Sequence, residues 1–244
     1  MGKTLASILA FCGLLFSLPA LGANKAERLN FDFAGHKRTI YFSVPEESGR
    51  LPAVVLLHGS GRNGEIMVDQ WRDLATREGI VLVAPDAYDP VGWNPKDDPP
   101  GFLHSSVQQV AARHPIDLNR IYLFGHSSGA EYALLLAILD SHYFAAVAVH
   151  AGSIAEANFK LFAYAGRRLP VGFWIGDRDP LFSLDTVKAT KRAFDQNGFS
   201  TQLTVLPNHD HNYYANSDLV NAQAWQFLMH TQLQPPAATK QSAQ

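Results

Sequence analysis

Short apolar runs alternate with longer amphipathic stretches along most of this 244-residue chain. A continuous apolar run is typical of a strand buried on both faces of a parallel sheet, and apolar residues at helical spacing indicate the helices that cover it. The predicted strands lie at residues 31–33, 39–44, 53–58, 80–84, 120–124, 145–150, 171–175 and 201–206. The first two strands, turned at Gly35, are expected to be antiparallel, and the other six alternate with helices. The pattern therefore predicts one α/β domain with a mostly parallel sheet of about eight strands and helices on both faces.

The predicted helices fill the gaps between these strands. They lie at residues 65–77, 102–113, 127–139, 156–165, 184–196 and 217–232. Gly79 is expected to end the first helix. A loop over residues 85–100 is rich in Pro, Asp and Gly. A loop this long in a compact domain is usually functional or mobile.

The N-terminus has the pattern of a secretory signal peptide. Lys3 precedes an apolar run over residues 5–18, which is too short for a helix across a bilayer, because that needs about twenty residues. The predicted segments are a cleaved leader (1–23), a folded catalytic domain (24–233) and a disordered tail (234–244). The only cysteine, Cys12, would leave with the leader. Export without disulfides favours a bacterial periplasm or the culture medium, with no stable membrane insertion after cleavage.

The charge balance argues against a nucleic-acid partner. The sequence carries 20 Lys and Arg against 22 Asp and Glu, a formal net charge of −2. Such a chain has no net positive field to attract a phosphate backbone. We therefore expect a small-molecule substrate and no nucleic-acid binding.

Residues 125–129 fit the pattern Gly-x-Ser-x-Gly between a predicted strand and a predicted helix. A serine on this sharp turn projects its oxygen from the sheet, and the glycines on either side remove side chains that would collide there. The amides at the start of the helix point at the place where negative charge develops. The alternative is an ordinary glycine-rich turn capping a helix. We predict that Ser127 is a nucleophile.

A serine nucleophile needs a base and an orienting carboxylate, which in this arrangement follow it in the order acid, then histidine. Asp177 and Asp179 both follow the predicted strand 171–175. We expect Asp179 to be the acid, with Asp177 as the alternative. His209 and His211 both follow the predicted strand 201–206, and only one can be the base. These two histidines with Asp210 between them lack further ligands for zinc, so we predict no metal and no cofactor.

The oxyanion of the tetrahedral intermediate also needs donors. The strand 53–58 ends at His58 and continues into Gly59, Ser60 and Gly61. Because this strand end should face the serine turn, we predict that the backbone amides of Ser60 and Ser128 form the oxyanion hole.

Together these features resemble the α/β-hydrolase superfamily, from about residue 53 to residue 228. The supporting residues are Leu56-Leu57-His58-Gly59, the turn at Ser127, Gly176-x-x-Asp179 and the histidine near 210. Within the superfamily the chain is similar to small secreted esterases related to polyhydroxybutyrate depolymerases and feruloyl esterases. The added support comes from Asn63, Gly101-Phe102, Ile116-Asp117-x-x-Arg120-Ile121-Tyr122 and residues 144–148.

The histidine segment departs from that group and resembles S-formylglutathione hydrolase (esterase D). The run His209-Asp210-His211-Asn212-Tyr213-Tyr214 is similar to the Tyr-Asp-His-Ser-Tyr-Tyr of that enzyme. Aligned in this way, the resemblance implies that His211 is the catalytic base, with His209 as the alternative.

The triad implies acyl transfer to Ser127 followed by hydrolysis. Trp93 and Tyr88, in the long loop, could line an acyl or aromatic pocket, although Trp93 could simply anchor the loop. Without room for a lid domain, a short-chain or hydroxycinnamoyl-type ester is expected. The rival hypotheses are a serine peptidase or amidase of the same fold and a non-catalytic binding protein.

Overall fold

The computed structural model describes residues 25–233. The leader predicted for 1–23 and the tail predicted for 234–244 lie outside the described residues. The eight strands are β1 (Glu27–Phe33), β2 (His36–Ser43), β3 (Leu51–Leu57), β4 (Val81–Pro85), β5 (Ile116–His126), β6 (Val147–His150), β7 (Val171–Gly176) and β8 (Thr201–Leu206). They form one sheet in the order β1-β2-β4-β3-β5-β6-β7-β8. The predicted number of strands is confirmed.

Strand direction follows the prediction. β1 and β2 are antiparallel and joined by a turn in which Ala34 and Gly35 have φ values of 50° and 81°. β2 also runs antiparallel to β4, whereas β3 to β8 pair in parallel. All six parallel strands therefore end at the same edge of the sheet, where loops can gather functional side chains.

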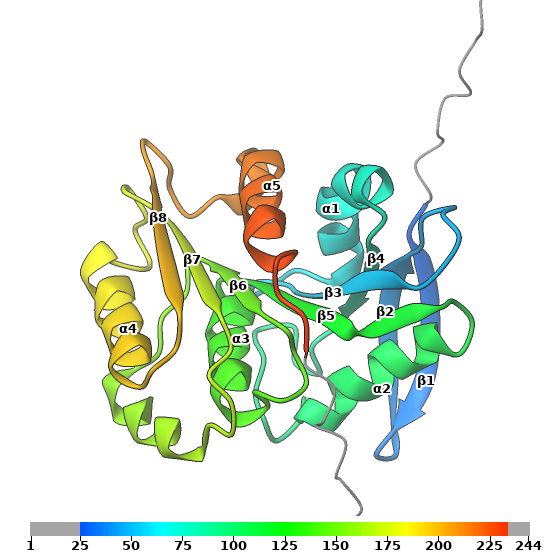
Figure 1. Cartoon of the computed structure of the whole chain (residues 1–244), viewed down its shortest axis with the longest axis horizontal. Coiled ribbons are helices and arrows are strands. Elements are labelled where there is room, and N and C mark those ends of the chain that lie inside the picture. The colour runs from blue at the N-terminus through cyan, green and yellow to red at the C-terminus, as the bar shows by residue number, and fades with distance from the viewer. Residues whose placement is uncertain (1–24, 234–244) are drawn as a thin grey trace, which may run out of the picture.

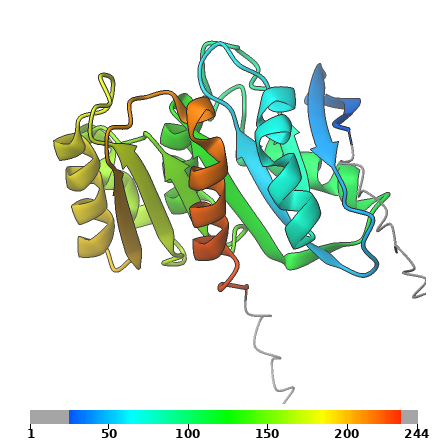
Figure 2. The same cartoon turned by 90° about the horizontal axis from the view of Figure 1, so that it is seen from above.

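Helices cover both faces (Figures 1 and 2). They are α1 (Gly64–Glu78), α2 (Pro100–Ala111), α3 (Ser128–Leu139), α4 (Leu184–Gln196) and α5 (Ser217–Leu228). α1 and α5 pack on one face, and α2, α3 and α4 pack on the other. Along β3, Val54 and Leu56 contribute to the core under α1 and α5, while Val55 and Leu57 contribute to the opposite core. This alternation explains why the strand reads as a continuous apolar run.

The ends of α1 are determined by local contacts, whereas the end of α5 is determined by contacts with distant residues. The side chain of Asn63 accepts a hydrogen bond from the amide of Ile66 and caps α1, and Gly79 (φ 66°) ends it as predicted. α5 ends at Leu228, four residues before the predicted end. The chain leaves the helix there because Tyr122 Oη donates to the carbonyl of Thr231 and the amide of Leu233 donates to Asn119.

The segment predicted as a helix over 156–165 is a 3₁₀ helix, η1 (Glu156–Tyr164). Phe159 and Phe162, three residues apart, contact each other with ring centroids 6.2 Å apart. Side chains at this spacing are aligned in a 3₁₀ helix. A second 3₁₀ turn, η2 (Tyr213–Ala215), precedes α5. None of the helices in residues 25–233 is long and apolar enough to cross a bilayer.

Candidate active site

Ser127 lies on a sharp turn between β5 and α3, at the centre of the sheet. Its φ of 55° and ψ of −120° place it in a conformation that side chains rarely adopt. A Cβ atom on Gly125 would overlap the carbonyl oxygen of Gly129, and one on Gly129 would overlap that of Leu57. Both glycines are therefore required by the close approach of strand and helix, as the sequence motif indicated.

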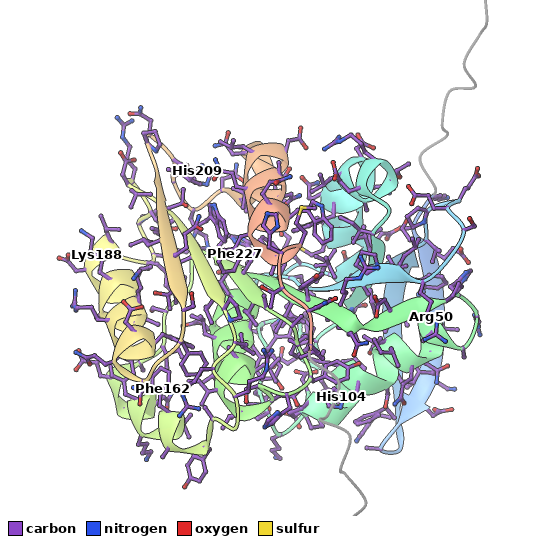
Figure 3. The ribbon with its side chains drawn as sticks, in the orientation of Figure 1. Arg50, His104, Phe162, Lys188, His209 and Phe227 are labelled. Carbon is purple, nitrogen blue, oxygen red and sulfur yellow. The ribbon has the colours of Figure 1, made fainter. Side chains whose placement is uncertain are left out.

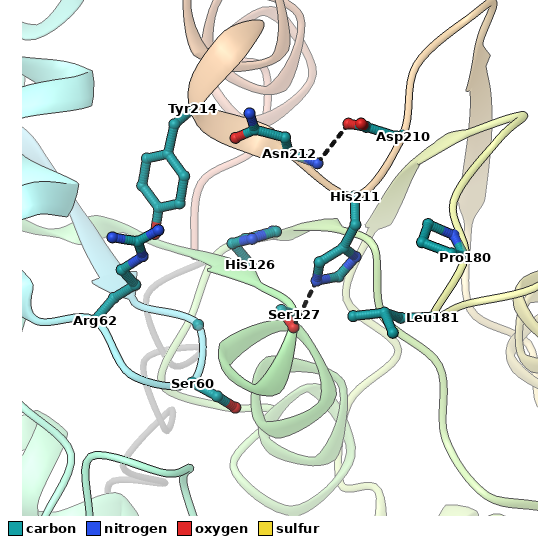
Figure 4. Close-up of a pocket in the computed structure, with 11 residues that line it drawn as sticks. Ser60, Arg62, His126, Ser127, Pro180, Leu181, Asp210, His211, Asn212 and Tyr214 are labelled. Carbon is teal, nitrogen blue, oxygen red and sulfur yellow. Dashed lines mark hydrogen bonds between the residues drawn. The ribbon is translucent and has the colours of Figure 1, made fainter.

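Three side chains from three loops form a continuous chain of hydrogen bonds. His211 Nε2 lies 3.0 Å from Ser127 Oγ, and His211 Nδ1 lies 2.8 Å from Asp179 Oδ2. Asp179 follows β7 and His211 follows β8, so neighbouring strand ends bring the two side chains together. Figure 4 shows His211 bonded to Ser127 in the pocket.

The Asp179 carboxylate is held from its other side. Its side chain is fully buried, and Oδ1 accepts hydrogen bonds from the amides of Leu181 (2.8 Å) and Phe182 (2.9 Å). The ring of Phe182 stacks on His211 with centroids 5.7 Å apart. These contacts fix the orientation of the carboxylate toward Nδ1 of His211, which leaves Nε2 free to accept a proton from Ser127.

The two alternative residues lie elsewhere. Asp177 is exposed on the turn after β7. His209 is 3% exposed and bonds to His150 and Asn216 rather than to Ser127. Asn208, with φ of 55°, turns the chain after β8, and the backbone of His209 packs directly on Gly176. Of the predicted triad residues, the structure brings together Ser127, Asp179 and His211.

The loop after β3 lies against the serine turn. A Cβ atom on Gly59 would lie 3.3 Å from Ser127 Cβ, so the absence of a side chain permits this approach. His58 holds the loop, because its Nδ1–H donates to the carbonyl of Gly59 (2.9 Å) and its Nε2 accepts from the amide of Ala87 (3.1 Å). Burial lowers the pKa of His58, which favours the neutral ring that this pairing requires. Within residues 25–233, the amides of Ser60 and Ser128 have no hydrogen-bond partner, as donors to an oxyanion require.

Two cavities flank the serine. The first, which we call the histidine pocket, has a volume of about 460 Å³ and contains the triad hydroxyl and imidazole. It is lined by Gly59, Ser60, Arg62, His126, Ser127, Pro180, Leu181, Asp210, His211, Asn212 and Tyr214. Sequence reasoning did not assign Arg62, whose guanidinium lies 5.0 Å from the ring centroid of Tyr214. The available signals in the sequence were the position of Arg62 three residues after Gly59 and the position of Tyr214 three residues after His211.

The second cavity, which we call the tryptophan pocket, has a volume of about 410 Å³ and shares Ser60 with the first. Its lining consists of Ser60, Val91, Gly92, Trp93, Ser128, Glu131, Tyr132, Leu135, Ser153, Ile154, Ala155 and Asn158. Trp93 both lines this cavity and anchors the loop, because its Nε1–H donates to the carbonyl of His58 (2.9 Å) and its ring stacks on Tyr132. Trp93 therefore anchors the loop and also lines a cavity next to the serine turn.

Tyr88 departs from the expectation that it lines a substrate pocket beside the serine. It is 49% exposed and packs against His36 and Arg38. It lines a separate cavity near the β1–β2 turn that contains none of the triad residues. The backbone of Tyr88 is held by its amide, which donates to Asp98 Oδ1 (2.9 Å). In residues 25–233, no group of three or more His, Cys, Asp or Glu side chains is arranged to hold a metal ion.

Comparison with known proteins places this geometry in context. A family model described as esterase PHB depolymerase matches residues 38–168, which include Ser60 and Ser127 and stop before Asp179. No curated protein matches the chain. Structurally, a thermostable esterase is similar over 85% of this chain and 63% of its own, with a TM-score of 0.68 and 17% identity. The chain thus spans less than two thirds of that esterase.

Two further structures are similar over almost their whole length. A fluorophosphonate-binding serine hydrolase from Staphylococcus aureus matches over 85% of this chain and 99% of its own, with a TM-score of 0.69 and 13% identity. A ferulic acid esterase from Anaeromyces mucronatus, in complex with ferulic acid, matches over 90% of this chain and 96% of its own, with a TM-score of 0.69 and 18% identity. At these identities the likeness concerns the fold.

Proposed function

The chain belongs to the esterase PHB depolymerase family and is a carboxylic ester hydrolase, and from this premise we propose that it cleaves its ester through an acyl-enzyme on Ser127. Family and fold confirm the resemblance to α/β-hydrolase serine esterases. The observation that supports the mechanism is the hydrogen-bonded chain from Asp179 through His211 to Ser127.

In the first step His211 accepts the proton of the Ser127 hydroxyl as Oγ attacks the ester carbonyl. The buried carboxylate of Asp179 stabilises the imidazolium that forms. The amides of Ser60 and Ser128 donate to the oxyanion, and each such donor is worth about 3 kcal/mol in comparable enzymes. His211 then gives its proton to the alcohol oxygen, and the alcohol leaves. A water molecule, activated by the same histidine, releases the acid and restores Ser127.

Proton transfer from His211 also decides which cavity takes which half of the ester. The leaving oxygen must lie within hydrogen-bonding distance of the histidine, so the alcohol part occupies the histidine pocket. The acyl part then extends into the tryptophan pocket on the Ser128 side.

The tryptophan pocket suits a short or flat acyl group. Trp93 and Tyr132 stack with centroids 5.9 Å apart and supply aromatic surface. We propose short-chain or hydroxycinnamoyl-type esters as substrates. The fold-related ferulic acid esterase, bound to ferulic acid, supports the second class.

The mechanism is tested with a fluorophosphonate probe, which reacts with activated serines. We expect covalent labelling of the wild-type protein and loss of both labelling and p-nitrophenyl acetate hydrolysis in Ser127→Ala, because the nucleophile is gone. Circular dichroism controls for folding of the variant. Hydrolysis retained at the wild-type rate by Ser127→Ala would overturn the mechanism. Amides of the same acids, turned over as fast as the esters, would favour a peptidase or amidase.

The substrate class is tested with Trp93→Leu on acetate and feruloyl esters. We expect kcat/KM for the feruloyl ester to fall about tenfold or more and that for the acetate to change much less, since only the larger group reaches the indole. Tyr88→Leu is the matched control, because Tyr88 lies outside both pockets. Equal losses on both esters would contradict the assignment of the tryptophan pocket.

A further inference from the structure

Three histidines outside the triad form a buried line that begins at the histidine pocket. His126 ends β5, His150 ends β6 and His209 follows β8. His126 Nδ1 lies 3.1 Å from His150 Nδ1, and His150 Nε2 lies 2.9 Å from His209 Nε2. The first contact arises because His126 and His150 are paired in register across the parallel strands. We call these residues the histidine chain; Figure 3 marks His209 near its outer end.

The outer end of the histidine chain meets Asn216. The amide nitrogen Nδ2 of Asn216 lies 2.6 Å from His209 Nδ1. An amide NH₂ group only donates, so His209 Nδ1 must accept. Asn216 is exposed and occupies the N-cap position of α5, where its side chain makes no capping hydrogen bond. Its described side-chain contact is therefore with His209.

We assign the protons along the line from this end contact, because each nitrogen–nitrogen hydrogen bond contains one proton and each neutral imidazole carries one. His209 accepts at Nδ1 and so donates from Nε2 to His150 Nε2. His150 then donates from Nδ1 to His126 Nδ1. His126 is left with its proton on Nε2.

Burial keeps the rings of His126 and His150 neutral, as the assignment of one proton to each ring requires. It lowers the pKa of His126 to about 3, with nearby His211 as the second cause, and it lowers the pKa of His150 well below its usual value. Within residues 25–233 no Asp, Glu, Lys or Arg side chain makes a hydrogen bond to the histidine chain, and a hydrogen bond to the backbone of His150 opposes the lowering of the His126 pKa.

The Nε2 edge of His126 faces the reaction space. Its Cδ2 atom, next to Nε2 and opposite Nδ1, would lie 3.1 Å from a Cβ on Gly59. His126 lines the histidine pocket, and its ring centroid is 5.0 Å from that of His211. The side-chain hydrogen bond that His126 makes within residues 25–233 is through Nδ1, so Nε2 lies on the side of the ring away from His150. Figure 4 shows the His126 ring between Tyr214 and His211.

We propose that His126 is a further substrate-binding residue, whose Nε2–H donates to the alcohol oxygen of the ester, and that Asn216 sets this proton through His209 and His150. The proposal rests on the function proposed above, because it requires the alcohol part to occupy the histidine pocket. A donor there stabilises the negative charge that develops on the leaving oxygen before His211 protonates it.

Nitrogen NMR of histidine-labelled protein tests the proton positions directly, because protonated and unprotonated ring nitrogens are distinguishable. We expect His126 protonated at Nε2, His150 at Nδ1 and His209 at Nε2. In Asn216→Asp at pH 9 the carboxylate can only accept, so all three tautomers should reverse. Ala215→Asp, with the same charge one residue away, should leave them unchanged. A His126 ring that keeps its tautomer in Asn216→Asp would overturn the proposal.

Kinetics test the donor. His126→Phe keeps an aromatic ring but loses the N–H, and His126→Gln keeps an N–H. We expect His126→Phe to lower kcat/KM about tenfold for ethyl acetate, with a smaller loss for p-nitrophenyl acetate, whose leaving oxygen needs less stabilisation. His126→Gln should recover part of the ethyl acetate activity. Equal losses on the two acetates would overturn the proposal, whereas fluorophosphonate labelling of Ser127 separately reports the triad.

Discussion

Ser127 combines a strained backbone with a fixed environment. A residue with a side chain in the left-handed region typically costs about 1–2 kcal/mol relative to an ordinary conformation. Surrounding hydrogen bonds hold it there: the amide of Ser127 donates to His150, and its carbonyl accepts from Ala130 and Glu131. Backbone contacts rather than the side chain therefore determine where the hydroxyl lies, and the side chain is left to react.

Asp179→Asn tests the carboxylate at the same scale. An asparagine can donate to Nδ1 of His211 and stabilise the wrong tautomer, so we expect kcat to fall by about 10⁴-fold, the loss that this change produces in a serine protease. Asp177→Asn is the matched control and should stay within a few-fold of wild type, because Asp177 is exposed. Ester hydrolysis by each variant gives the answer, and a greater loss in Asp177→Asn would reverse the assignment.

The loop between β4 and α2 is the element that carries Trp93, and a buried ion pair holds it. Arg38 of β2 lies 2.5 Å from Asp98 Oδ1, and both side chains are almost fully buried. Asp98 Oδ1 also accepts from the amide of Tyr88, and Arg38 donates to the carbonyls of Asp86 and Asp97. The antiparallel β1–β2 hairpin thus stabilises one wall of the tryptophan pocket.

Removing Asp98 should destabilise this element. Asp98→Ala leaves the Arg38 guanidinium buried without its carboxylate, and we expect the free energy of unfolding to fall by about 3–5 kcal/mol in urea titrations. Asp97→Ala is the control, because within residues 25–233 that half-buried side chain bonds only to Asn94. The double change Arg38→Met with Asp98→Ala should recover much of the loss. If the single Asp98 change had no effect, the ion pair would not hold the loop.

The whole molecule contains several histidines that are neutral and buried. Burial lowers the pKa of His58, His126 and His150. In the unfolded chain these rings have an ordinary pKa near 6.5. Below about pH 6.5 the unfolded chain therefore binds protons that the native state does not bind, so stability falls as the pH falls toward the lower native pKa values.

We expect each such histidine to reduce the free energy of unfolding by about 1.4 kcal/mol per pH unit below pH 6.5. Urea unfolding at pH 7.5 and 5.5 measures the change. His150→Gln, which removes one titrating ring, should show a shallower pH dependence than wild type. Equal stability of the wild-type protein at the two pH values would contradict this account.

Local patterns predicted much of the fold. Apolar runs and helical spacing depend on which faces of an element are buried, so the eight strands and the capped helix α1 were readable from the chain. The segment at η1 was not, because three-residue and four-residue spacings of apolar side chains overlap in so short a stretch. The end of α5 depended on distant contacts with Tyr122 and Asn119.

By itself the sequence determined the α/β class, the serine turn and the strand ends that carry the proposed acid and base, since each follows from neighbouring residues. Only the tertiary structure placed Asp179 rather than Asp177, and His211 rather than His209, beside Ser127. The sequence left Asp177 and His209 open as alternatives, because residues two apart after the same strand are about equally close to its end. Their hydrogen bonds distinguish them, since His211 bonds to Asp179 and Ser127, whereas His209 bonds to His150. The histidine chain likewise exists only because β5 and β6 pair in register.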